Sequence, residues 1–297
     1  MFASRAIAQT HEFTTGGVVR RYSLIAPSDA DLGALPVVVD LHGSGSNPHE
    51  HLEVTEAATS AARGALVVLP WAGIPFRLLE GWPAGWAWNV PGNPLPGETV
   101  VREEPDDVAF IGALIERLVQ HHAVDAHRIH LRGYSGGARL CSHLLARIPG
   151  QLRSVCCVGG VRFVPPSSAA ALPPVLAVHG CKDTFNPYAG GSGPRWSESV
   201  ESAVQQWAAT MYCEPAPRMD APADGVLEAR YVDPAGLGAV RLISVVAAGH
   251  SWPGTQHVDH IAQFGDPGAF SASHAHWDFV QEVETDSAGV TIQVTGC

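Results

Sequence analysis

Short runs of mainly apolar residues constrain the fold of this chain more than any other feature of its sequence. They occur at Val37–Leu41, Leu66–Leu69, Ser154–Val158, Val175–Val178 and Val240–Val246. Segments with apolar residues at helical spacing lie between several of these runs, as at 107–118. Strands that are apolar on both faces need cover on both sides, which is typical of a mostly parallel sheet with helices on each face. The sequence therefore predicts an α/β fold.

The rest of the pattern fits one domain built on such a sheet. Helices are expected at 52–63, 107–118, 138–147, 196–211 and 273–283. Asp106 is the expected N-cap of the second of these helices. Val18–Ile25 and the pair 227–232 and 240–246 are expected as antiparallel edges, and 71–105 is the longest irregular stretch. We interpret 1–297 as one domain, with its core at about 18–284.

Composition and charge narrow the classes of partner. The chain has 297 residues, of which 46% are hydrophobic, and a formal net charge of −11. An acidic surface repels phosphate backbones and anionic lipid, so we expect no nucleic-acid partner. No apolar run approaches the roughly 18 residues that a membrane span needs. Residues 1–10 lack the apolar segment of a signal peptide, so the sequence as given indicates a cytoplasmic protein.

Six cysteines and fifteen histidines raise the questions of disulfides and metals. The cysteines are scattered, and sequence alone cannot resolve their pairing. Cys156 and Cys157 lie in an apolar run, where we expect buried, unpaired thiols on opposite faces of a strand. Close histidine pairs include His49/His51, His257/His260 and His274/His276. No pair comes with cysteine or acidic partners at ligand spacing, so we predict no metal site and no cofactor.

The segment Gly133-Tyr134-Ser135-Gly136-Gly137 carries the pattern G-x-S-x-G. A predicted strand at 128–132 precedes it and a predicted helix follows it. In this context the serine of such a motif stands on a tight strand-to-helix turn, where its hydroxyl is available as a nucleophile. A purely structural glycine turn is the alternative. A serine nucleophile also needs a base, and the base needs a carboxylate that orients it.

Asp183 and His250 are the candidates for that carboxylate and that base. Each follows its own apolar strand, and both come after Ser135 in the order serine, acid, histidine. This is the order that α/β-hydrolases use. The sequence therefore predicts a catalytic triad of Ser135, Asp183 and His250.

Three other residues compete for these roles. His179 precedes the acid, which is the wrong order, and we interpret it as a structural residue at a strand end. Asp106 and Asp107 precede the serine and lie at the start of a helix. We therefore do not favour any of the three.

Acyl transfer also needs backbone N–H groups that bind the oxyanion. One is expected from Gly136, the residue after the nucleophile. The other is expected from the loop after His42-Gly43, with Ser44 as the candidate and Gly45 as its alternative.

Large rings near these motifs are candidates for holding an acyl group, although each could simply pack in the core. They are Trp82, Trp86, Trp88, Tyr134, Tyr188 and Trp252. We predict substrate contact from Trp88, Tyr134, Tyr188 and Trp252. Trp252 is the strongest of these candidates because it lies two residues after the predicted base.

At this point the sequence resembles the polyhydroxybutyrate depolymerase-like and feruloyl esterase-like α/β-hydrolases. The matching segments are Leu41-His-Gly43, Trp88-Asn89, Asp106-Asp-Val108, the Ser135 motif, His179-Gly-x-x-Asp183, Pro187-Tyr188-x-Gly-Gly191, Gly249-His250-Ser-Trp252-Pro-Gly254 and Trp277-Asp278-Phe279. The resemblance implies the α/β-hydrolase fold and the same triad. It also implies an extracellular or envelope esterase that acts on aromatic acyl esters or hydroxyacyl polyesters.

The chain departs from the family pattern at three places. Val90-Pro-Gly-Asn-Pro94 stands where cysteines are usual, and Val232-Asp-Pro234 stands near a position that often holds another. Trp71 replaces an acidic residue. The family's disulfides are therefore not carried over to this chain.

Our hypothesis is a serine carboxylic ester hydrolase that forms an acyl-enzyme, with aromatic (feruloyl-type) or small acyl esters as substrates. The alternative within the class is a polyester depolymerase. Alternatives from other classes are a serine peptidase and a non-catalytic binding protein with a hydrolase fold. Activity on p-nitrophenyl acyl esters beside a peptide substrate would separate these classes.

Overall fold

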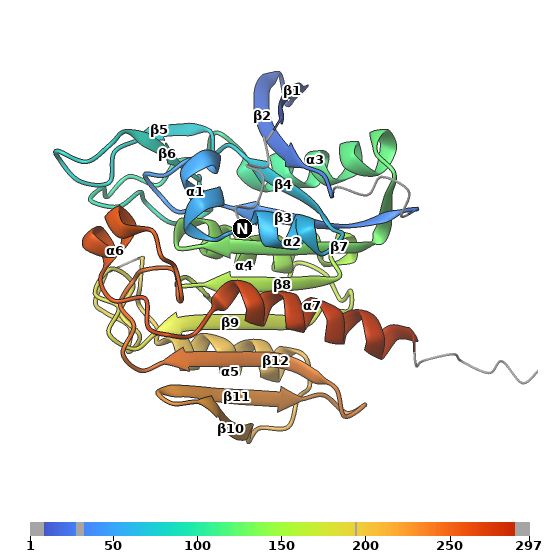
Figure 1. Cartoon of the computed structure of the whole chain (residues 1–297), viewed down its shortest axis with the longest axis vertical. Helices are drawn as coiled ribbons and strands as arrows, with labels where there is room; N and C mark the ends of the chain where they lie inside the picture. The colour runs from blue at the N-terminus through green and yellow to red at the C-terminus, as the bar shows by residue number, and fades with distance from the viewer. Residues whose placement is uncertain (1–8, 28–32, 194, 289–297) are drawn as a thin grey trace, which may run out of the picture.

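The structure, a computed structural model, describes residues 9–27, 33–193 and 195–288. Its main feature is a ten-stranded sheet with the order β1-β2-β4-β3-β7-β8-β9-β12-β11-β10 (Figure 1). In chain order the strands are β1 Gln9–Thr15, β2 Val18–Ile25, β3 Leu35–Leu41, β4 Leu66–Pro70, β7 Val124–Tyr134, β8 Ser154–Val158, β9 Val175–Gly180, β10 Arg218–Ala223, β11 Val226–Val232 and β12 Gly238–Val245. Within this order, the six consecutive strands β4-β3-β7-β8-β9-β12 run parallel to one another. This confirms the predicted mostly parallel sheet.

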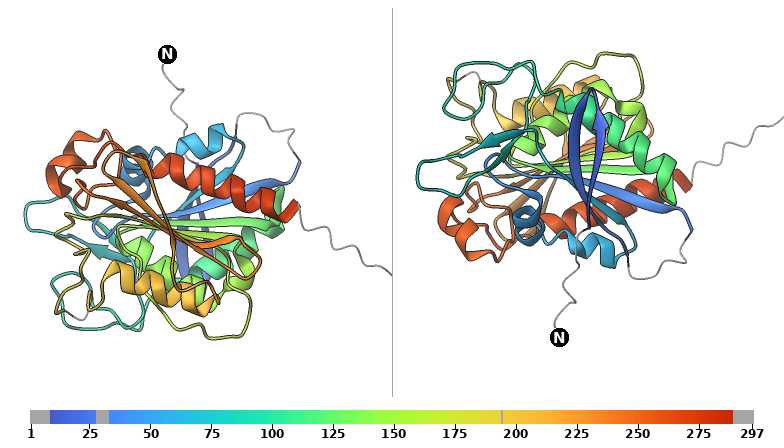
Figure 2. Two further views of the ribbon diagram at one scale, coloured as in Figure 1. Left: turned by 90° about the horizontal axis from the view of Figure 1, so that it is seen from below. Right: turned by 90° about the horizontal axis from the view of Figure 1, so that it is seen from above.

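Helices cover both faces of the sheet (Figure 2). One face carries α3 Asp107–His121, α4 Gly136–Arg147 and α5 Val200–Thr210. The other carries α1 Pro48–Val54, α2 Ala58–Ala62 and α7 Ala272–Ala288. A single 3-10 turn at Pro149–Gln151 and the short helix α6 Val258–Phe264 complete the helices of the described part of the chain. The α/β class predicted from the sequence is confirmed.

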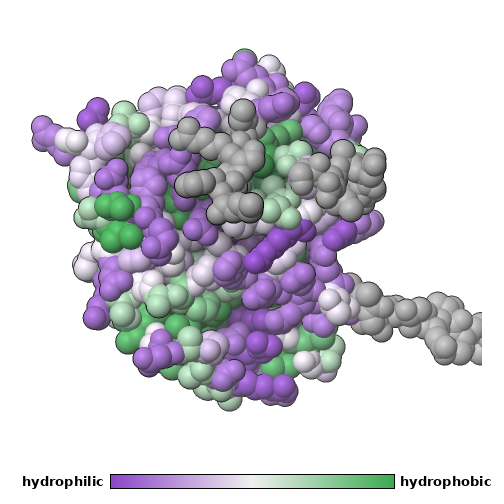
Figure 3. Space-filling view, viewed as in Figure 1, coloured by the Kyte–Doolittle hydropathy of each residue, from purple (hydrophilic) through white to green (hydrophobic). Residues whose placement is uncertain are grey.

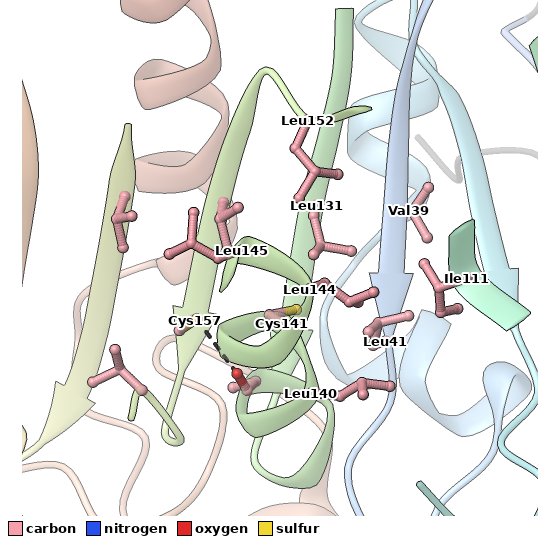
Figure 4. Close-up of a cluster of buried hydrophobic side chains, with 14 of the residues drawn as sticks. Val39, Leu41, Ile111, Leu131, Leu140, Cys141, Leu144, Leu145, Leu152 and Cys157 are labelled. Carbon is pink, nitrogen blue, oxygen red and sulfur yellow. Dashed lines mark hydrogen bonds between the residues drawn. The ribbon is translucent and has the colours of Figure 1, made fainter. Parts of the chain in front are cut away.

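Alternation along the central strands divides the core between these two faces. Val39 and Leu41 of β3 pack against α4, whereas the intervening Val38 packs with Trp277 of α7. Figure 4 shows the first of these layers, in which the leucines of α4 point toward β3 and β7. Burying each such Val or Leu side chain contributes about 1.5–3 kcal/mol. This packing fixes α4 against the strands on either side of β7.

Cys156 and Cys157 follow the same alternation. Cys157 lies in the core layer under α4, and Cys156 lies in the layer toward α7. Both are buried free thiols, as predicted, and Cys141, Cys181 and Cys213 are also free. Cys297 lies outside the described residues.

The predicted helix at 52–63 begins earlier and is interrupted. Asn47 caps α1 by accepting from the backbone N–H groups of His49 and Glu50, so the helix begins at Pro48. Glu56 then adopts a positive φ of 49°, which separates α1 from α2. The predicted helix at 196–211 likewise begins only at Val200, because the Ser199 hydroxyl caps α5.

The sequence analysis missed the edge strands β1 and β10 and the helix α6, besides the short strands β5 Ile74–Phe76 and β6 Gly85–Ala87 inside the stretch expected to be irregular. β1 pairs outside β2, and β10 pairs outside β11, so Val18–Ile25 is not the edge that was predicted. Both edge strands are largely exposed and lack the apolar pattern of a core strand. Helix α6 is short and buries only His260 within its span, so it leaves little periodic signal.

The side of the molecule seen in Figure 3 is mainly hydrophilic, with apolar areas that are separate from one another. None of the described helices combines the length and apolar character needed to cross a membrane. The N-terminal residues 1–8, on which the signal-peptide expectation rests, lie outside the described residues.

The carboxyl ends of the parallel strands meet at one side of the sheet, where α1 and α6 also lie (Figure 1). Most of the irregular stretch 71–105 is there too, and it contains the small sheet of β5 Ile74–Phe76 and β6 Gly85–Ala87. In parallel α/β sheets, ligands bind beyond the carboxyl ends of the strands. The predicted functional residues follow β3, β7, β9 and β12 at this side.

Candidate active site

Ser135 stands on a sharp turn between β7 and α4. Its backbone has φ 52° and ψ −110°, a strained conformation for a residue with a side chain. The turn is held by the N–H of Ser135, which donates to the carbonyl of Val158 at 2.9 Å. Glycine is required at Gly133, because a Cβ there would lie 2.6 Å from the backbone of Gly137. The predicted strand, serine turn and helix are thus all present.

His250 and Asp183 complete a hydrogen-bonded chain with this serine. The Ser135 Oγ lies 2.9 Å from His250 Nε2, and His250 Nδ1 lies 2.6 Å from Asp183 Oδ2. Asp183 follows β9 and His250 follows β12. All three side chains are at least nine-tenths buried. The structure therefore brings together the three residues that the sequence separated by up to 115 positions.

Asp183 is held as a carboxylate by its surroundings. Burial alone would raise its pKa, but the charge of His250 and the hydrogen bonds from His179 and His250 outweigh burial. The pKa of Asp183 therefore lies well below its usual range. Its Oδ1 accepts the backbone N–H groups of Phe185, at 2.9 Å, and Asn186, at 2.7 Å. An ionised Asp183 accepts the proton on His250 Nδ1 and leaves Nε2 free to accept from the serine hydroxyl.

None of the three competing residues takes the place of His250 or Asp183 in this chain of hydrogen bonds. His179 is buried, with its Nε2 2.9 Å from the carbonyl of Asn186 and 3.3 Å from Asp183 Oδ2. Asp106 caps α3, as predicted, and Asp107 pairs with the guanidinium of Arg20.

The candidate oxyanion donors, Ser44 and Gly136, lie on segments that are in close contact. The loop after β3 touches the start of α4, so that a Cβ on Gly136 would lie 3.3 Å from the nitrogen of Ser44. The N–H of Gly45 instead donates to the carbonyl of Trp86 at 2.9 Å. The N–H of Gly45 is thereby engaged, which leaves Ser44 as the candidate donor in this loop.

Comparison with protein families gives one match, to the family described as Esterase PHB depolymerase, over residues 20–172. This covers more than half of the chain. The chain belongs to this family. It is therefore a carboxylic ester hydrolase, as predicted. The matched residues include Ser135 and end before Asp183 and His250.

Solved structures agree on the fold. An acetyl xylan esterase from Aspergillus awamori is 14% identical with a TM-score of 0.60, and the match covers 86% of this chain and 98% of that chain. The esterase PE8 is 20% identical with a TM-score of 0.54, covering 88% of this chain and 97% of that one. The α/β-hydrolase fold is thereby confirmed. The search of curated proteins gave no match.

The esterase has a cavity above Ser135 and His250, walled on one side by aromatic rings. Phe185 stacks on the His250 ring with centroids 5.2 Å apart, and Phe264 packs edge-on to Phe185 at 5.2 Å. Trp82 continues this wall, 5.4 Å from Phe264. All three rings line the cavity. Sequence analysis missed Phe185 and Phe264, although the place of Phe185 two residues after Asp183 was an available signal.

The rings predicted to contact substrate are distributed differently. Tyr134 lines the cavity and donates its hydroxyl to the carbonyl of His250. Trp252 is only 1% exposed, donates to Ser273 and lies outside the cavity lining. Trp88 is equally buried, and its indole N–H donates to the carbonyl of His42. The Tyr188 hydroxyl bonds Ser244, also away from the cavity. The last three therefore occupy packing positions in the esterase.

Proposed function

We propose that the esterase hydrolyses its substrates through a triad of Ser135, His250 and Asp183. The observation that carries this proposal is the continuous chain from Ser135 Oγ to His250 Nε2, at 2.9 Å, and from His250 Nδ1 to Asp183, at 2.6 Å. Ser135 attacks the ester carbonyl carbon while its hydroxyl proton passes to His250 Nε2. Asp183 keeps the imidazole in the required tautomer and stabilises the imidazolium that forms.

The oxyanion of the tetrahedral intermediate accepts from the N–H groups of Ser44 and Gly136. When the intermediate collapses, the bond from the carbonyl carbon to the alcohol oxygen breaks, and His250 gives its proton to that oxygen. Water then attacks the acyl-enzyme by the reverse sequence, releasing the acid and restoring the Ser135 hydroxyl. These steps need no metal or cofactor, and we assign them to a single catalytic domain.

We assign aromatic (feruloyl-type) or small acyl esters as the substrates. The supporting feature is the wall of Trp82, Phe185 and Phe264 beside His250. Flat rings in this arrangement offer edge and face contacts to an aromatic acyl group, each contributing about 0.5–1.5 kcal/mol beyond area burial. The second candidate is hydrolysis of hydroxyacyl polyesters, which is favoured by the description of the family that the chain matches.

The test compares methyl ferulate, p-nitrophenyl butyrate, a hydroxybutyrate oligomer and a peptide in the wild type and in Ser135→Ala. We expect ester hydrolysis in the wild type and a loss of several orders of magnitude in Ser135→Ala. Ser168→Ala, at an exposed serine outside the cavity, is the control and should keep full activity.

Trp82→Ala separates the two substrate classes. It should lower kcat/KM for methyl ferulate more than for the oligomer. A tenfold or greater wild-type preference for the oligomer would favour the depolymerase function, and cleavage of the peptide instead of esters would favour a peptidase.

A further inference from the structure

A buried guanidinium without a partner lies in the active-site cavity. Arg139 is only 3% exposed, and its Nε and Nη1 atoms are buried with no hydrogen-bond partner among the described residues. It lines the cavity together with Ser135 and His250. Its backbone N–H donates to the carbonyl of Ser135 at 3.1 Å, so it begins the helical turn that follows the nucleophile. Leaving a buried charged donor unpaired is costly, which makes this position unusual for a purely structural arginine.

A second arginine accompanies it. Arg195 also lines the cavity, and its buried Nε has no partner in the part of the chain that the structure describes. Burial lowers the pKa of Arg195 to about 10, so its guanidinium is charged at neutral pH. Burial, and then the charges of Arg195 and Arg162, lower the pKa of Arg139. The other charges that act on Arg139 are therefore repulsive.

Two carboxylates of this region pair with other cationic groups, and a third lines the cavity without an ion pair among the described residues. Glu198 pairs with Arg162, and Asp183 is occupied by His250. Glu50 lines the same cavity and accepts from the hydroxyl of Ser46 at 2.7 Å. None of them is paired with Arg139 or Arg195 in the described part of the chain. An anionic group entering the cavity would supply the missing acceptor.

We propose that Arg139 and Arg195 form an anion subsite for a carboxylate carried by the ester substrate. This proposal rests on the proposed esterase function and adds a charge requirement to it. A guanidinium presents a planar fork of donors that matches a carboxylate. The carboxylate belongs either to the acyl part, as in a half-ester of a dicarboxylic acid, or to the alcohol part, as in an oligomer of hydroxy acids. Both sources place the same group beside the scissile ester.

Two pairs of substrates distinguish these sources. In the first, p-nitrophenyl hemiglutarate is compared with its neutral amide, p-nitrophenyl glutaramate. In the second, the dimer of 3-hydroxybutyrate is compared with its C-terminal amide. We expect the wild type to prefer the carboxylate by about tenfold or more in one of the pairs, as a charged hydrogen bond predicts. The pair that shows the preference identifies the side of the ester that the arginines bind.

Substitution of the arginines tests their part in this preference. The ratio of kcat/KM for the carboxylate over its amide should fall about tenfold or more in Arg139→Gln. Arg195→Gln provides the same test if Arg139→Gln fails to fold. Arg147→Gln is the matched control, since it removes the same charge from an exposed position on the same helix. A ratio near one in the wild type, or a ratio that survives both substitutions, overturns the proposal.

Binding to the inactive Ser135→Ala variant gives a measurement that does not depend on catalysis. Calorimetry should detect glutarate binding, and adding Arg195→Gln should weaken it about tenfold or more. Glutarate that fails to bind, or that binds equally with and without Arg195→Gln, counts against the subsite. The esterase function is judged separately, because it fails only if the wild type cleaves none of the esters or if Ser135→Ala retains activity.

Discussion

The ends of β9 and β12 each place a histidine beside Asp183, yet the two histidines are in different situations. His250, after β12, lies 2.6 Å from Asp183 through Nδ1 and 2.9 Å from Ser135 through Nε2. His179, at the end of β9, lies 3.3 Å from Asp183 through Nε2. That same nitrogen also contacts the carbonyl of Asn186, and within residues 9–27, 33–193 and 195–288 the buried Nδ1 has no partner.

The two histidines differ in what contacts the ring nitrogen that does not face Asp183. His250 spans the acid and the nucleophile and lines the cavity. The ring of His179 is packed beside Tyr188 and Trp196 and has no contact with Ser135. Contact with the carboxylate is therefore not sufficient for a general base, which must also reach the hydroxyl. His179 is in a position to orient Asp183, and His250 to transfer the proton.

Removing the ring that bridges acid and nucleophile is expected to have the largest effect. His250→Ala should lower kcat for p-nitrophenyl butyrate by roughly 10⁴- to 10⁶-fold, because triad members act as a unit. The fold, checked by circular dichroism, should be retained. Near-normal turnover in this variant would contradict the assignment of His250 as base.

Replacing Asp183, the carboxylate that both histidines contact, should have the second-largest effect on kcat. Asp183→Asn keeps the shape of the side chain but favours the wrong imidazole tautomer, so kcat should fall by roughly 10⁴-fold. Steady-state kinetics on p-nitrophenyl butyrate measure this effect. A loss below tenfold would show that His250 does not depend on Asp183.

A much smaller effect is expected from the other histidine. His179→Phe removes the imidazole N–H that meets Asp183, and losing a typical hydrogen bond changes rates by roughly two- to tenfold. The loss should fall on kcat, with KM unchanged, because His179 does not line the cavity. A loss as large as that of His250→Ala would give both histidines the same role.

The remaining prediction concerns stability and its dependence on pH rather than the rate. The pKa of Asp183 is lower in the folded protein than the roughly 3.9 of an unfolded chain, so its charge stabilises the fold above about pH 4. This stabilisation is lost as the pH falls below that value. Urea unfolding should therefore find Asp183→Asn less stable than the wild type by about 1–3 kcal/mol at pH 7, with the difference shrinking toward pH 3. A difference that stays constant with pH would contradict the lowered pKa.

Much of the site could be predicted because each residue carries a local signal. Ser135 stands in a five-residue motif between a strand and a helix, and Asp183 and His250 follow apolar strands. The aromatic wall could not be predicted in the same way. Phe264 lies on α6, a short helix without an apolar stripe. It meets Phe185 only because α6 and the segment after β9 fold over the same end of the sheet.

The predicted role of Trp252 illustrates the same limit. Its place two residues after His250 suggested contact with substrate, but the ring is only 1% exposed and lies outside the cavity lining. It packs edge-on to Tyr134, and Arg132 lies over its face. Proximity in sequence therefore identified the right segment without identifying which side chains face the cavity.

The sequence by itself determined the α/β class, the serine turn and the order of the triad, since these depend on periodicity and on neighbours along the chain. Tertiary structure alone decided which rings line the cavity and which arginines are left unpaired within the described part of the chain. These features depend on contacts between residues far apart in the sequence, such as Phe185 and Phe264. Strand order and loop packing set such distances, and no local pattern records them.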